Sequence, residues 1–179
     1  AARWGLAQRQ RGEAATLGSP FPVLGRLGSA AVQPSTLTCG SAAHLRVQFT
    51  TLQAVPAGGK VTVAAPSGFR WQQAGAGGCY TFDHVNWPGT ATCTVAGSTL
   101  LLAPSAPLSM HTFFAFSLSG QLPPSSTADR YFSISTESAT TALDSAPRVS
   151  WSAQTHASSG SLVFPEALGC HPRALSAFQ

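Results

Sequence analysis

The segment from Cys79 to Cys93 brings together several side chains of this 179-residue sequence that could do chemistry. It reads CYTFDHVNWPGTATC and holds one aspartate, one histidine and three aromatic residues. Cys79, His84 and Cys93, with Asp83 as a fourth ligand, would make a metal site. Structural zinc sites, however, usually take cysteines two to four residues apart. Asp83 and His84 would also point to opposite sides of an extended segment, so we expect no metal here.

A cysteine nucleophile is also disfavoured in this segment. A reactive thiol is free and lies near positive charge, whereas the cations nearest in sequence are distant. No hydrolase, zinc-protease or kinase signature is present. Dispersed ionisable residues are expected as turn caps, surface charges and outward strand positions; they include Asp83, Asp129, Asp144, Glu137, Glu166, His44 and His111. The sequence therefore predicts a protein that is not an enzyme and needs no cofactor.

A disulfide between Cys79 and Cys93 is the favoured interpretation of the segment. The loop of 13 residues that it would enclose would stabilise the fold by about 3 kcal/mol in the chain-entropy model. Four cysteines allow three pairings. Choosing the local pair leaves Cys39 to bond Cys170, which would tie the C-terminal tail to the domain. Both bonds require an oxidising compartment.

Charge is scarce and unevenly distributed. Charged residues make up 9% of the chain, against roughly a quarter in an average soluble protein. The net charge of +4 comes mostly from the first 30 residues, where the basic residues are Arg3, Arg9, Arg11 and Arg26. These arginines are too scattered for a nucleic-acid surface, so we expect an anionic protein or lipid surface as their partner. No apolar run is long enough to span a bilayer, so any membrane contact is expected to be peripheral.

Short alternating segments predict the fold. They lie at residues 44–51, 60–66, 68–71, 92–95, 98–103, 111–120, 130–137 and 148–153, with a tight hairpin at Ala96-Gly97. The residues that share one face of their strand are Leu45, Val47, Phe49, Val61, Val63, Phe69, Trp71, Val95, Leu100, Leu102, Phe114, Phe116, Leu118, Phe132, Ile134, Val149 and Trp151. Seven or eight such strands, with no convincing amphipathic helix between them, indicate an all-β antiparallel sandwich.

Several of these segments resemble a known group of modules. The stretches LRVQFTTLQAVPAGGKVTVAAPSGFRW, CTVAGSTLLLA and HTFFAFSLSGQL are similar to the immunoglobulin-like β-sandwich modules repeated in large secreted or surface proteins of algae and related protists, including dinoflagellates. The resemblance covers residues 41–153. It implies an immunoglobulin-like fold and a structural or assembly role outside the cytosol, and it transfers no catalytic residue. Such modules usually occur in tandem, whereas this chain holds one.

The expected organisation is a sandwich between two arms. Residues 1–36 are predicted as a basic extended arm, 37–155 as the sandwich and 156–179 as a tail that docks through apolar residues such as Phe164. Tyr80, Trp87 and Trp71 are candidates for a protein interface or for stacking on a sugar, unless they cover an end of the core.

Three functions remain open at this stage. The first is a structural or adhesion module, cross-linked by disulfides, in an extracellular or cell-surface assembly with other proteins. The second is an extrinsic subunit on the lumenal side of a large membrane complex, such as one in the thylakoid lumen, that docks through its arms. The third is a carbohydrate-binding module.

Overall fold

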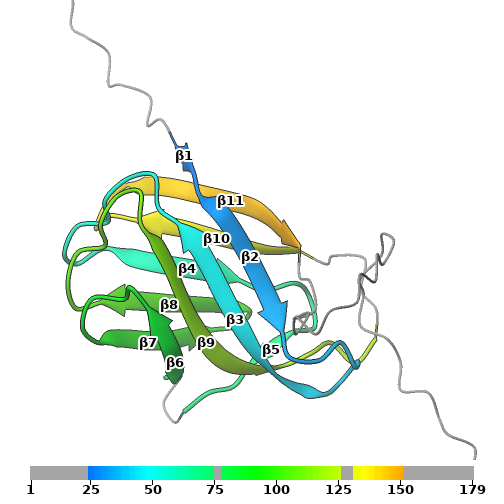
Figure 1. Ribbon diagram of the computed structural model, residues 1–179. Coiled ribbons are helices and arrows are strands. Elements are labelled where there is room, and N and C mark those ends of the chain that lie inside the picture. Colours follow the sequence, from blue (N-terminus) through cyan, green and yellow to red (C-terminus); the bar gives the residue numbers. More distant parts are fainter. Residues whose placement is uncertain (1–23, 75–77, 126–130, 151–179) are drawn as a thin grey trace, which may run out of the picture.

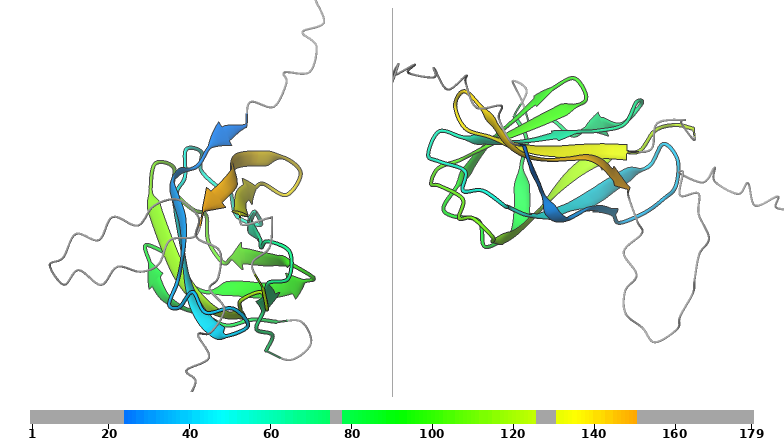
Figure 2. Two further views of the ribbon diagram at one scale, coloured as in Figure 1. Left: turned by 90° about the vertical axis from the view of Figure 1, so that its right-hand side faces the viewer. Right: turned by 90° about the horizontal axis from the view of Figure 1, so that it is seen from above.

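Two β-sheets face each other in the computed structural model of this chain, as Figures 1 and 2 show. The structure describes residues 24–74, 78–125 and 131–150, and within these ranges it contains strands and turns but no helix. The expected all-β sandwich is confirmed. Its strand segments place apolar residues, many of them valine or phenylalanine, at alternate positions, which suits the pleat of a half-buried strand.

In the described residues one sheet has six strands and the other has five. The larger sheet has the order β1-β11-β10-β4-β8-β7, with bounds Gly25–Arg26, Ala142–Ser150, Tyr131–Glu137, Lys60–Ala64, Thr99–Pro104 and Ala91–Ala96. The smaller sheet has the order β2-β3-β9-β5, and β6 also pairs with β9. Its strands run over Gly28–Pro34, Ala42–Thr50, Phe113–Gln121, Arg70–Trp71 and Thr81–Val85.

The core lies between the sheets and is built by the predicted alternation. In the smaller sheet Leu45, Val47 and Phe49 of β3 lie opposite Leu118, Phe116 and Phe114 of β9, and all six are at most 1% exposed. The larger sheet supplies buried residues of the same kind, namely Val61, Val63, Leu100, Leu102, Phe132 and Ile134. Burial of these side chains is the main force holding the sheets together.

The hairpin predicted at Ala96-Gly97 is confirmed. It joins β7 to β8, with Ala96 opposite Thr99 and Val95 opposite Leu100. Gly97 has a φ of 60°, in the left-handed region that glycine adopts without steric cost.

The strand count and one boundary differ from prediction. Eleven strands occur in the described residues, because several are too short or too exposed to show an alternating pattern. Residues 25–34, expected within the N-terminal arm, form β1 and β2, and they were missed because glycine, alanine and proline interrupt them. Residues 1–23, the tail 156–179 and Trp151 lie outside the described residues.

Candidate functional site

The disulfide between Cys79 and Cys93 is present and positions the segment that follows it. The two Cα atoms are 5.1 Å apart, and the Cys79 backbone N–H donates to the Cys93 carbonyl at 3.1 Å. This holds residue 79 against the edge strand β7 of the larger sheet. Two residues later the chain enters β6, which pairs with β9 of the smaller sheet. The bonded segment therefore spans both sheets.

Only one cysteine of the second predicted disulfide, Cys39, lies within the described residues. None of the described cysteines is free, and Cys39 is disulfide-bonded. Cys170 lies outside the described residues, so its pairing with Cys39 stays a prediction. Arg3, Arg9, Arg11 and Phe164 also lie outside them. Within the described ranges, no three histidine, cysteine or acidic side chains gather as a metal site would require.

Two of the three aromatic binding candidates, Trp71 and Trp87, are buried, so they offer no binding surface. Trp71 is 5% exposed and its Nε1–H donates to the Ser98 carbonyl at 2.8 Å. Trp87 is 9% exposed and meets the rings of Phe114 and Phe116 edge-on. Both belong to the buried core, which is the alternative that the sequence left open for them.

Tyr80 is the predicted aromatic that does reach solvent. Its side chain is 80% exposed. Phe82, which the sequence did not single out, is 37% exposed and lies opposite Ser117 of β9. Because Leu118 points into the core, Ser117 and Phe82 lie on the outer face of the smaller sheet. The backbone of Tyr80 and Phe82 is anchored by the disulfide at Cys79 and by the pairing of β6 with β9.

His44 of β3 lies on the same outer face, opposite Ser119 of β9. Its ring meets Phe82 edge-on, with centroids 5.4 Å apart, and its Nδ1 lies 3.0 Å from the Ser119 hydroxyl. Beside these residues is a shallow pocket of about 230 Å³, lined by Gln72, Gln73, Ala74, Tyr80, Phe82 and Ser119. We call it the Tyr80 pocket. None of its lining side chains carries a charge.

A larger groove lies where the two sheets separate. Strand β1 pairs in parallel with β11 only at Gly25 and Arg26, after which the chain leaves for the smaller sheet as β2, as Figure 1 shows. Between β11 and the start of β2 lies a groove of about 860 Å³, lined by residues 24–30 and 145–149. We call it the seam groove.

The seam groove has an apolar floor and a basic rim. Leu27 and Val149 are buried at 4% and 3% exposure. Arg26 and Arg148 are exposed, and the Arg148 guanidinium lies 4.7 Å from the centre of the Tyr131 ring. No acidic residue lines the groove. Arg26 was singled out from the sequence, but Arg148 was not, because only the pairing of β1 with β11 brings them to one place.

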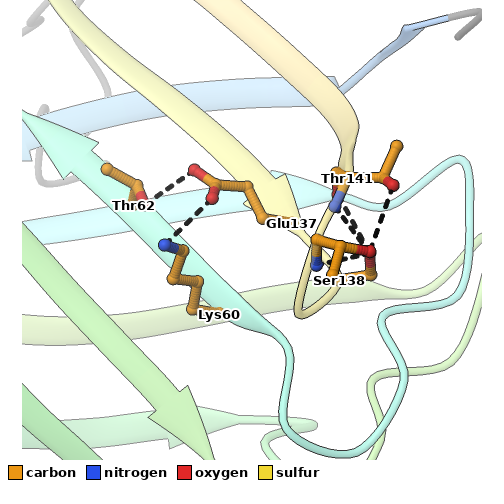
Figure 3. A network of polar contacts seen from close by, with 6 residues as sticks. Lys60, Thr62, Glu137, Ser138 and Thr141 are labelled. Carbon is orange, nitrogen blue, oxygen red and sulfur yellow. Dashed lines mark hydrogen bonds and ion pairs between the residues drawn. The ribbon is translucent and has the colours of Figure 1, made fainter.

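Three other ionisable residues, Lys60, Glu137 and Asp144, have structural partners. Lys60 forms an ion pair with Glu137, with Nζ and Oε2 3.1 Å apart. Figure 3 shows this pair beside the Ser138–Thr141 turn that joins β10 to β11. Asp144, expected as a turn cap or surface charge, is instead fully buried. It accepts hydrogen bonds from the backbone N–H groups of Leu52 and Gln53, which compensates the lost hydration of its carboxylate.

Comparison with known proteins assigns the chain to no family. No family model and no curated protein matches the chain. Among solved structures, it is similar to a GH20 exo-β-N-acetylglucosaminidase from Vibrio harveyi in complex with N-acetylglucosamine, at 14% identity and a TM-score of 0.35. An inactive mutant of that enzyme gives the same values. The match covers 71% of this chain but 18% of the enzyme, and at that TM-score it carries no argument. No helix in the described ranges has the length and hydropathy to cross a membrane.

Proposed function

We propose that this chain is a non-enzymatic structural module that assembles with other proteins at the cell surface or outside the cell. The observation that carries the proposal is the seam groove, with its apolar floor and its two exposed arginines. A groove of this kind suits an extended segment of a neighbouring protein that supplies apolar side chains to the floor and carboxylates to the rim.

The strand arrangement supports an immunoglobulin-like module. The neighbour orders β2-β3-β9-β6 and β11-β10-β4 correspond to the A-B-E-D and G-F-C orders of a constant-type immunoglobulin domain. Along the chain these seven strands also occur in the order β2, β3, β4, β6, β9, β10, β11, which corresponds to A, B, C, D, E, F and G. The hairpin β7–β8 is then an insertion that extends the second sheet beside β4. Modules of this architecture commonly serve recognition and assembly, which is an argument by analogy.

The disulfide supports the proposed location. A bond between Cys79 and Cys93 is compatible with an oxidising compartment, since cytosolic reductants keep most thiols reduced. Both the cell exterior and an organelle lumen meet this condition. An extrinsic subunit on the lumenal side of a membrane complex would use the same groove, so the identity of the partner separates the two locations.

Charge reversal at the rim tests the proposal. A tagged chain is purified from its source under native conditions, and the co-purifying proteins are identified and quantified by mass spectrometry. Arg26→Glu combined with Arg148→Glu should reduce the stoichiometric partner at least about tenfold. Arg46→Glu combined with Arg70→Glu is the matched control, because it makes the same charge change away from the groove. Equal retention by both double variants would refute the proposal.

A further inference from the structure

We infer that the Tyr80 pocket is a binding site for an uncharged saccharide, separate from the seam groove. The inference is independent of the proposed assembly role, because it rests on a different face of the sandwich. Its basis is one small pocket that is lined both by an exposed aromatic side chain next to a disulfide and by uncharged hydrogen-bonding side chains.

The backbone that carries the aromatic residues of the pocket is anchored on both sides of Tyr80. Tyr80 directly follows the disulfide-bonded Cys79, and Phe82 is held in the β6–β9 pairing. An exposed aromatic ring on a fixed backbone loses little conformational entropy on binding. The apolar C–H face of a sugar ring can lie on such a surface and remove it from water, while its hydroxyl groups remain at the edge.

The polar side of the pocket supplies both donors and acceptors without charge. Gln72 and Gln73 are exposed, and no hydrogen bond within the described residues engages their side-chain amides. Each amide donates through its NH₂ and accepts through its oxygen, which matches adjacent sugar hydroxyls that do both. The Ser119 hydroxyl, already bonded to His44, retains further hydrogen-bonding capacity.

Charge and size narrow the ligand class. An anionic ligand would find no cation among the lining side chains, and a cationic ligand would find no carboxylate. The volume of about 230 Å³ is below the roughly 300–1,000 Å³ of pockets for drug-sized molecules. One sugar ring of a longer chain is therefore the expected occupant, with a dissociation constant on the order of 1 mM.

The two tyrosines of the chain provide an internal control for the test. Tyr80 and Tyr131 are the only tyrosines, and Tyr131 lies beside Arg148 at the seam groove. The full chain is labelled with 3-fluorotyrosine, and its two ¹⁹F resonances are assigned with Tyr131→Phe. Cellohexaose, xylohexaose, mannohexaose and chitohexaose are then titrated separately to about 10 mM.

The expected result is a saturable shift of the Tyr80 resonance with at least one neutral oligosaccharide, while the Tyr131 resonance stays in place. Gln72→Ala should weaken sugar binding several-fold. Calorimetry should show that Tyr80→Ala abolishes sugar binding and that Tyr131→Ala retains it. The inference is overturned if none of the four sugars shifts the Tyr80 signal saturably. It is also overturned if a sulfated hexasaccharide shifts Tyr80 more strongly than every neutral one, or if Tyr131 responds instead.

Discussion

The carboxylate of Asp144 on β11 accepts a hydrogen bond from the backbone N–H of Gln53 at 2.9 Å. The same oxygen accepts the N–H of Leu52 at 3.0 Å, and the Gln53 side-chain amide donates to the Leu143 carbonyl at 2.8 Å. The connection after β3 is thereby fastened to β11. Gly25 of β1 lies directly against this carboxylate and pairs with Asp144 where β1 joins β11.

Replacing Asp144 with asparagine should destabilise the fold by roughly 2–3 kcal/mol. The two backbone N–H groups would then bond to a neutral oxygen in place of a charged one, and the new NH₂ group would face the Gln53 side-chain amide that donates to the other carboxylate oxygen. Urea denaturation measures the change. Glu137→Gln is the control, since its ion pair with Lys60 is partly exposed and should contribute less than about 1 kcal/mol. Equal losses in the two variants would contradict the structural role assigned to Asp144.

Gly25→Ala should destabilise the protein by about 1–3 kcal/mol, because the new Cβ would collide with the Asp144 carboxylate. Gly28 offers a matched control in the next strand, where a Cβ would make only an ordinary contact 3.4 Å from Thr50. Gly28→Ala should change the stability by less than about 0.5 kcal/mol. Thermal unfolding separates the two, and a neutral Gly25→Ala variant would show that β1 does not press against Asp144.

Trp71→Phe should cost about 1 kcal/mol more than Trp87→Phe. Both lose ring volume from the core, but Trp71 also loses its hydrogen bond to Ser98. The Trp87 Nε1 is buried with no hydrogen-bond partner among the described residues, so its removal relieves an unsatisfied donor. Chemical denaturation of the two variants checks the ranking. The reverse order would indicate that the Trp87 indole N–H is satisfied.

Converting both Cys79 and Cys93 to serine should lower the free energy of unfolding by about 3 kcal/mol in the chain-entropy model. The resulting loss of order around Tyr80 should also weaken binding of neutral sugar at the Tyr80 pocket. Non-reducing peptide mapping of the wild-type protein confirms the bond beforehand. A double variant as stable as the wild type would contradict the disulfide's assigned role.

The sequence was sufficient to predict the sandwich and its central strands, because their alternation directly reports burial. Val47 and Phe49 show this most clearly, since both were expected to face inward and both are fully buried. The local disulfide between Cys79 and Cys93 was also predictable, because a short excursion between two strands readily brings its ends together.

The candidate surfaces were much less predictable. Trp87 was expected at the surface or at an end of the core, and only the packing of β9 shows that it is buried. Arg148 and Arg26 are 122 residues apart in the sequence, so their common groove depends on a parallel pairing of two residues. Asp144 resembles an ordinary surface acid until the backbone N–H groups that surround it are known.

Hydroxyl-radical footprinting of the native assembly, compared with the isolated chain, tests the central claim most directly. Leu24 at the seam groove and Met110 outside it are both 53% exposed, so they form a matched pair. We predict that Leu24 and its groove neighbour Pro147 become protected in the assembly, while Met110 is oxidised as in the isolated chain. Protection of Met110 with unchanged oxidation of Leu24 would contradict the claim that the seam groove holds the partner.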